Sequence, residues 1–184
     1  MTLKLTAGTL ALKAGDTFVD ETARPLAQAA VKEAKKFMGE GNKLCCNLAN
    51  RSRSTLKLRQ FYVPNGKSVG DTPAWILSPG KTTGWAAKKL AGHTNGSWVI
   101  AIYSNGKRNH MFGACHPFLG QSEMALASDF EDWRFATEEA AIELYMEHSD
   151  NTKFVFGNEE SRLEAVKGYT KDAIVTVKFR FVDK

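Results

Sequence analysis

Short apolar runs alternate with turn-forming clusters from Leu44 to Phe118, and this pattern constrains the possible folds more than any other feature of the chain. Each run is too short for a stable helix, and its β-branched and aromatic residues, bounded by Gly, Pro, Asn and Ser, are typical of strands. Several short strands at close spacing indicate a sandwich or barrel, not a parallel sheet with crossover helices. The runs are Leu44–Leu48, Thr55–Tyr62, Trp75–Leu77, Trp98–Tyr103 and Met111–Cys115.

Two segments outside this stretch have helical patterns. In Arg24–Met38, Pro25 suits the first turn, where its missing N–H costs nothing, and Gly39 provides a stop. In Thr137–Met146, an apolar stripe recurs at helical spacing. Both helices are expected to lie against the outside of the strand-rich core. The stripe of the second helix consists of Ala141, Leu144, Tyr145 and His148.

The segment Ala173–Phe181 alternates between apolar and polar residues, which predicts a strand with one face on a core and one face in water. Together these elements predict a mainly β fold, an antiparallel β-sandwich flanked by two α-helices. A chain of 184 residues can bury a substantial core without disulfides or metals. We therefore expect one β-sandwich domain over residues 1–184.

Neither a membrane-spanning helix nor a secretory leader is predicted. No apolar run approaches about 20 residues, the length that a spanning helix needs. Met1–Ala14 leans apolar, but Lys4 and Lys13 bracket a span that is too short for the core of a signal peptide. We expect a protein that is soluble when made and acts in the cytoplasm, after secretion, or at a membrane surface.

Three cysteines, an odd number, leave two interpretations open. Cys45 and Cys46 are adjacent, so in a strand they would face opposite sides. Reduced and partly buried thiols are the simpler interpretation. A disulfide from one of the pair to Cys115 is the alternative.

The net charge of +5 conceals a gradient along the chain. Residues 41–110 carry eleven Lys or Arg and one Asp or Glu, whereas residues 111–184 carry eight and fourteen. A basic block beside an acidic one indicates either an interaction with an anionic partner or contact between the two blocks.

The sequence contains no enzyme signature. It lacks GxSxG, HExxH, GxxxxGK[ST] and helix-opening GxGxxG patterns. Cys115 and His116 are adjacent and would point apart in a strand, so they form a poor catalytic dyad. A zinc site from the three cysteines and His116 lacks paired-ligand spacing. We therefore predict a protein that is not an enzyme and that holds no cofactor and no metal.

Four short motifs follow one another at a characteristic spacing between Leu44 and Phe118. They are Asn50-Arg51-Ser52, Pro79-Gly80-Lys81, Gly96-Ser97-Trp98-Val99 leading into Tyr103, and Phe112 with Pro117-Phe118. In their order and spacing they resemble the actinoporins, pore-forming cytolysins that bind sphingomyelin-containing membranes. The resemblance extends through the second helix and the closing strand, and it implies an actinoporin-like sandwich with one helix on each face.

The resemblance also implies a headgroup site. In actinoporins a phosphocholine group lies in a cavity of tyrosines, a serine and a proline, because aromatic faces attract a quaternary ammonium. Here Gly113 stands in place of the serine, and Trp98 in place of a valine. The aromatic-rich loop of the family is replaced by Leu119–Met124, which contains no Trp or Tyr. The candidate lipid or glycan headgroup residues are Trp98, Gly113, Pro117, Phe118 and Tyr145.

By resemblance, the protein would bind a membrane lipid, insert its N-terminal helix and form pores as a homo-oligomer. The inserting face would consist of Leu26, Ala30, Phe37 and Met38. One alternative is a non-lytic, lectin-like module for a glycan or lipid, because fungal fruit-body lectins share this sandwich without lysing cells.

A further alternative is an intracellular protein that docks an acidic partner through a basic patch. Nucleic acid is not favoured as that partner, because aromatic residues are not interleaved with the cations as in a stacking platform. The patch would consist of Arg51, Arg53, Lys57 and Arg59, which alternate and would share one face of a strand.

Overall fold

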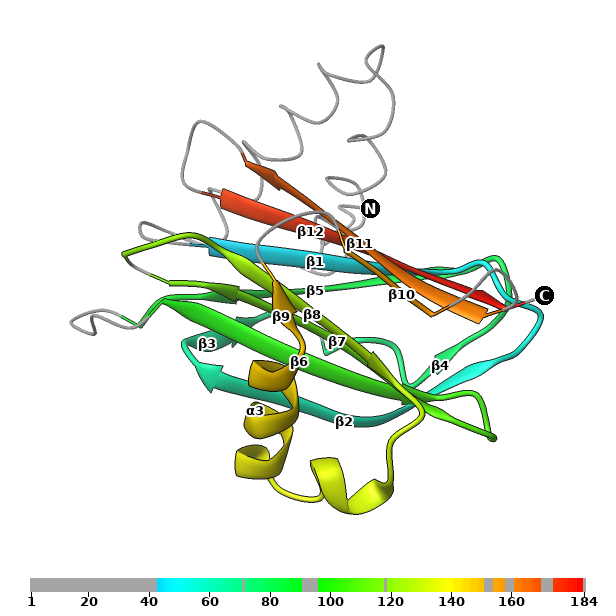
Figure 1. Ribbon diagram of the computed structural model, residues 1–184. Helices are drawn as coiled ribbons and strands as arrows, with labels where there is room; N and C mark the ends of the chain where they lie inside the picture. Colours follow the sequence, from blue (N-terminus) through cyan, green and yellow to red (C-terminus); the bar gives the residue numbers. More distant parts are fainter. Residues whose placement is uncertain are drawn as a thin grey trace, which may run out of the picture.

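The computed structural model describes residues 43–70, 72–90, 96–117, 119–150, 154–157, 161–169 and 174–183. Within these residues the chain forms twelve strands, one α-helix and one short 3-10 helix (Figure 1). The predicted helix Arg24–Met38, the apolar-leaning segment Met1–Ala14 and Phe118 lie outside the described residues.

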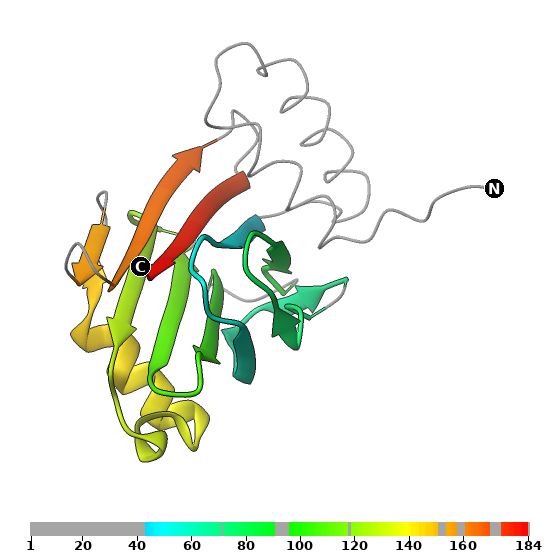
Figure 2. The ribbon, with the colours of Figure 1, turned by 90° about the vertical axis from the view of Figure 1, so that its right-hand side faces the viewer.

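The strands form two six-stranded sheets that pack face to face, as Figure 2 shows from the side. Sheet 1 has the order β10 (Phe154–Gly157), β11 (Ser161–Tyr169), β12 (Ile174–Asp183), β1 (Lys43–Asn50), β5 (Thr82–Lys88) and β3 (Lys67–Val69). Sheet 2 has the order β4 (Ile76–Leu77), β2 (Leu56–Asn65), β6 (Ser97–Ser104), β7 (Asn109–His116), β8 (Glu123–Ser128) and β9 (Ser149–Asp150). The prediction of a mainly β sandwich is confirmed.

One strand pair departs from the antiparallel pattern. The first described strand, β1, pairs parallel with β12 in sheet 1, whereas its other neighbour, β5, is antiparallel to it. The strands of sheet 2 pair antiparallel throughout the described residues. Pairing β1 with β12 joins the two ends of the described chain and places β1 inside the sheet.

The core between the sheets follows the alternation of the sequence. The inward apolar positions of β12 are buried, and Lys178 and Arg180 on the other face are partly exposed, whereas Thr176 on that face is buried. Trp85 on β5 is fully buried and stacks on Phe179, with ring centroids 6.1 Å apart. Burying each such ring stabilises the fold by about 2–3 kcal/mol. The inward positions of β12 are Val175, Val177, Phe179 and Phe181.

The second predicted helix is present on the outer face of sheet 2. Helix α3 spans Glu138–Glu147, and the side chain of Thr137 caps it by accepting a hydrogen bond from the backbone N–H of Ala140. The 3-10 helix η3, Asp132–Phe135, precedes it. The buried stripe of α3 covers an apolar area of β6 and β7, so packing offsets the unfavourable row of acidic residues on the helix. The packed residues are Ala141, Leu144, Tyr145, Ile100, Ile102 and Met111.

Candidate functional site

Three of the predicted headgroup residues come together on the outer face of sheet 2. In the antiparallel pair β6–β7, Trp98 lies opposite Cys115, and Ile100 lies opposite Gly113. Tyr145 reaches this face from α3, and its ring meets that of Trp98 edge-on, with centroids 4.9 Å apart and planes at 65°. We call Trp98, Gly113 and Tyr145 the aromatic cluster.

The absent side chain of Gly113 makes this contact possible. A Cβ atom at this position would lie 2.5 Å from Cδ2 and 2.7 Å from Cε2 of Tyr145. Such distances are too short for any side chain, so the glycine lets the ring lie directly on the strand. The tyrosine ring therefore fills the space in which the actinoporin resemblance would place a serine.

Two polar atoms of the cluster are buried without a partner. The hydroxyl of Tyr145 and the Nε1–H of Trp98 form no hydrogen bond with the described residues. An unpaired buried polar group costs about 1–3 kcal/mol. Burial is the largest cause that raises the pKa of Tyr145, with smaller contributions from the neighbouring Cys115 and Glu123. The phenol therefore stays protonated, and both atoms can donate to an acceptor.

Segments that carry apolar and cationic residues lie at the same end of sheet 2 as the cluster. Leu119 in the β7–β8 connection is 83% exposed, and Met146 on α3 is 60% exposed. Pro117 is half-buried directly after β7. The backbone of Lys88, followed by Lys89, lies beside Gly66, which in turn adjoins Gly96 just before β6. We call this surface the Trp98 end: it comprises the aromatic cluster with Lys88, Lys89, Pro117, Leu119 and Met146.

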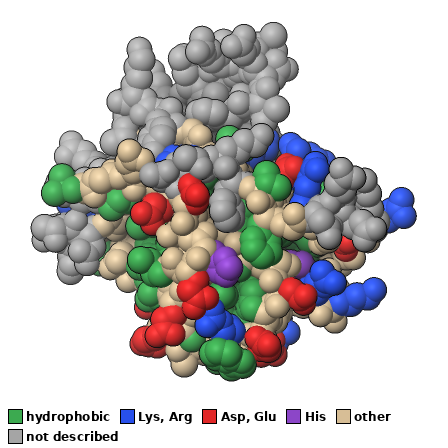
Figure 3. Space-filling view, in the orientation of Figure 1, with side chains coloured by type: hydrophobic (Ala, Val, Ile, Leu, Met, Phe, Trp, Pro, Cys, Tyr) green, Lys and Arg blue, Asp and Glu red, His purple; other side chains and the backbone are tan. Residues whose placement is uncertain are grey.

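The predicted basic patch divides into two parts. Lys57 and Arg59 are exposed on β2 and share a face, whereas Arg51 and Arg53 lie in the bend between β1 and β2, not on the strand. Arg59 forms an ion pair with Asp132 at 3.0 Å. The space-filling view shows acidic side chains gathered over α3 and cations towards the right-hand side (Figure 3).

Contacts between the basic and acidic blocks account for part of the charge gradient. Besides the pair with Arg59, Arg108 lies 3.8 Å from Asp129, so residues of the basic stretch face residues of the acidic stretch. These pairs are exposed and contribute little to stability, about 0–1 kcal/mol each. They reduce the positive charge that this face presents to an acidic partner.

Sequence reasoning missed a pocket at the opposite end of sheet 2. The pocket has a volume of about 320 Å³, and none of the predicted headgroup residues that the structure describes lines it. Its walls are the β6–β7 turn, the segment after β8 and Arg59. The Asn-Gly-Lys-Arg turn and the Ser-Asp stretch at residues 128–129 are the sequence signals, but only the fold brings them together.

The sulfur and imidazole groups do not form a reactive site in the described residues. All three cysteines are free, with Cys46 in the central core. Burial raises the pKa of Cys45 and of Cys115 to about 12, so both thiols remain protonated at neutral pH. His116 Nδ1 lies 2.9 Å from the Ser122 hydroxyl. No group of three potential metal ligands occurs among the described residues.

Solved structures with the same fold include a lipid-binding protein and a lectin. The lipid-binding protein Nakanori matches with a TM-score of 0.71 and 14% identity, over 98% of this chain and 89% of its own. A lectin from Xerocomus chrysenteron matches with a TM-score of 0.51 and 7% identity, over 76% of this chain and 98% of its own. No protein-family model and no curated protein matches the sequence. At these identities the likeness shows the fold, which is the sandwich that the actinoporin resemblance implied.

Proposed function

We propose that the protein is a lipid-binding module that docks on a membrane surface through the Trp98 end. The shared fold with Nakanori, which is described as a lipid-binding protein, supports the class of ligand. Fold alone does not assign function. The location of the contact therefore rests on the residues of this chain.

The aromatic cluster is the observation that carries the proposal. Trp98 and Tyr145 form an amphipathic pair whose two donors, Nε1–H and OH, have no partner among the described residues. Both donors are buried, so the rings would have to move to expose them to a lipid headgroup. Once exposed, they would donate to its phosphodiester oxygens. Rings of this kind are enriched where lipid meets water. A headgroup at the cluster would thus remove the cost of the two unpaired atoms.

The surroundings of the cluster suit an anionic or zwitterionic lipid surface. Leu119 projects into solvent and would enter the interface without any change of fold. Cations near a membrane surface contribute about 1 kcal/mol each when anionic lipid is present. Lys88 and Lys89 therefore predict stronger binding to vesicles that contain phosphatidylserine.

Co-sedimentation with vesicles of phosphatidylcholine, sphingomyelin or phosphatidylserine tests the proposal. Leu119→Glu should weaken binding about tenfold or more, because it replaces buried apolar area in the interface with a charge. Ile76→Glu is the matched control, since Ile76 is also exposed, at 63%, but lies on β4 away from the Trp98 end. Equal losses in both variants, or no binding to any vesicle, would reject it.

Pore formation is a separate step in this proposal. After docking, the segment Arg24–Met38 would enter the bilayer with the face formed by Leu26, Ala30, Phe37 and Met38, and several copies would assemble. No helix of the described residues is long and apolar enough to cross a membrane. Release of a trapped dye from vesicles measures this step. Release by the native chain and its loss in Phe37→Glu, with co-sedimentation unchanged, would support insertion.

Binding of a glycan without lysis is the second candidate function. The match to the Xerocomus chrysenteron lectin and the replacement of the aromatic loop by Leu119–Met124 favour it. A glycan array distinguishes the two functions. Retention on specific glycans with no retention on vesicles would favour the lectin-like role.

A further inference from the structure

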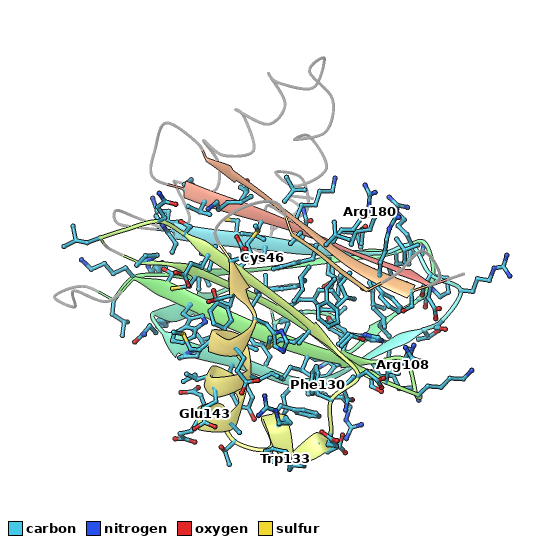
Figure 4. The ribbon with its side chains drawn as sticks, in the orientation of Figure 1. Cys46, Arg108, Phe130, Trp133, Glu143 and Arg180 are labelled. Carbon is cyan, nitrogen blue, oxygen red and sulfur yellow. The ribbon has the colours of Figure 1, made fainter. Side chains whose placement is uncertain are left out.

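The pocket at the other end of sheet 2 lies far from the aromatic cluster. The cluster is at the start of β6 and the pocket is at its end, so the length of the strand, about 20 Å, separates them. Arg108 from the β6–β7 turn and Phe130 from the segment after β8 both line the pocket (Figure 4). A ligand here would not compete for space with one at the Trp98 end.

Hydrogen bonds fix the turn that forms one wall. The Asn105 side-chain oxygen accepts from the backbone N–H groups of Lys107, at 3.0 Å, and of Arg108, at 2.9 Å. The Ser104 hydroxyl oxygen accepts from the backbone N–H of Gly106 at 3.1 Å. The turn is thus ordered before any ligand arrives, which lowers the entropy cost of binding.

A buried amide fixes the opposite wall. Asn109 is 8% exposed, and its Nδ2 donates to the backbone oxygen of Phe130, at 2.8 Å, and to Oδ1 of Asp132, at 3.1 Å. Directly before Phe130, Asp129 has a φ of 66°, in the left-handed region that few residues other than glycine adopt. Its N–H donates to the Asn109 backbone oxygen at 2.9 Å. Hydrogen bonds to Asn109 thus hold the loop at residues 129–132 in an uncommon conformation beside the pocket.

The charges of the pocket balance, which indicates the kind of ligand. Three cations and three carboxylates line it, and two ion pairs, at 3.0 and 3.8 Å, link members of the two sets. A set with zero net charge offers no overall attraction to a charged ligand. It does suit hydroxyl groups, because each can donate to a carboxylate and accept from a guanidinium. The charged residues are Arg59, Lys107, Arg108, Asp129, Glu131 and Asp132.

We propose that this pocket binds a neutral pyranose sugar. The charged side chains would contact the ring hydroxyls, and Phe130 would pack against the apolar C–H face of the sugar. A volume of about 320 Å³ is at the small end for ligand sites, which suits a single sugar ring. The sugar as ligand class rests on the second candidate function above, and it does not require the lipid contact at the Trp98 end.

Titration of the full chain with D-galactose, D-glucose, D-mannose and N-acetylglucosamine, followed by amide NMR, tests this site. At least one sugar should shift the amide signals of Gly106, Arg108 and Phe130. Asp132→Asn should lower the affinity for that sugar about tenfold, because it removes a charged acceptor. Glu143→Gln, on α3 outside the pocket lining, is the matched control and should bind like the native chain.

The proposal is overturned if no sugar of the panel shifts these signals, if Asp132→Asn and Glu143→Gln bind equally, or if only inorganic phosphate binds. Vesicle co-sedimentation of Asp132→Asn separates the two sites. Unchanged sedimentation with lost sugar binding assigns the sugar to the pocket. Loss of sugar binding in Tyr145→Phe, with Asp132→Asn unaffected, would assign it to the aromatic cluster and also reject the proposal.

Discussion

Gly113 determines how Tyr145 lies on sheet 2. Because a Cβ atom would approach the tyrosine ring to 2.5 Å, the glycine and the ring depend on each other. The actinoporin resemblance would place a serine at this position, whereas the glycine here leaves that space to a packed ring. The Tyr145 hydroxyl is buried there and has no hydrogen-bond partner among the described residues.

Gly113→Ser should therefore destabilise the protein by about 1–3 kcal/mol, because the ring must leave its place or the strand must move. Urea unfolding followed by circular dichroism measures this change. In a Tyr145→Leu background the same substitution should cost less, since the smaller side chain leaves room. An equal loss of unfolding free energy in both backgrounds would show that the Tyr145 ring does not restrict residue 113.

Because His110 is buried, we predict that the protein loses stability in mild acid. His110 is fully buried, with Nδ1 2.8 Å from the Ser128 hydroxyl and its ring 4.5 Å from that of Phe181. Burial lowers the pKa of His110 to about 4, against opposing effects from Asp183 and Asp129, and Arg108 lowers it further. Between pH 4 and 6.5 the unfolded chain then binds more protons than the folded chain.

The free energy of unfolding should therefore fall as pH drops from about 6.5 to 4, by up to about 3 kcal/mol from this residue. Urea titrations across this range measure it. His110→Gln cannot titrate, so the difference from the native chain should shrink towards low pH. The same slope in both proteins would contradict the effect of burial on His110.

The start of α3 gives a prediction at the scale of the elements. Thr137 Oγ1 accepts from the Ala140 backbone N–H at 3.2 Å, and this residue is exposed. Thr137→Ala should lower the unfolding free energy by about 1 kcal/mol, because the Ala140 backbone N–H at the start of the helix loses its partner. Thr137→Ser keeps the acceptor and should unfold within a few tenths of a kcal/mol of the native chain. Thermal unfolding of the two variants decides this point.

Strands with a clear apolar alternation could be predicted from the sequence, and strands rich in helix-forming residues could not. The strand β12 was found because every second residue is apolar. By contrast, β8 (EMALAS) and β11 (SRLEAVKGY) contain residues with high helix propensity. Their neighbours β7 and β12 hold them as strands, and tertiary pairing of this kind overrides local preference. The parallel pairing of β1 with β12 also depends on contacts far apart in sequence.

The two candidate sites also differ in how far the sequence predicts them. The actinoporin resemblance singles out Trp98 and Tyr145, but it does not predict how they pack at Gly113. The pocket combines Arg59, the β6–β7 turn and residues 129–132, which are distant along the chain. No local pattern joins these segments, so only the sheet order brings them to one place.

At the scale of the whole molecule, the two ends of sheet 2 have different chemistry. The Trp98 end combines exposed apolar side chains with an aromatic pair, whereas the other end holds a charge-balanced pocket. If the Trp98 end docks on lipid, the pocket at the other end of sheet 2 remains open to water. Saturating vesicles should therefore leave the affinity for the bound sugar unchanged within about twofold. Competition between vesicles and sugar, measured by equilibrium dialysis, would show that both ligands use one surface.

The position of the four tryptophans allows the most direct test of membrane docking. Trp98 lies in the aromatic cluster, Trp85 is buried in the core, and Trp75 and Trp133 are 69% and 64% exposed elsewhere. In the variant Trp75→Phe with Trp133→Phe, only Trp98 can report on lipid. We predict that vesicles with lipids brominated near the headgroup quench the fluorescence of this variant at least as strongly as that of the native chain. Loss of quenching in this variant would place the membrane contact at Trp75 or Trp133 and contradict docking through the Trp98 end.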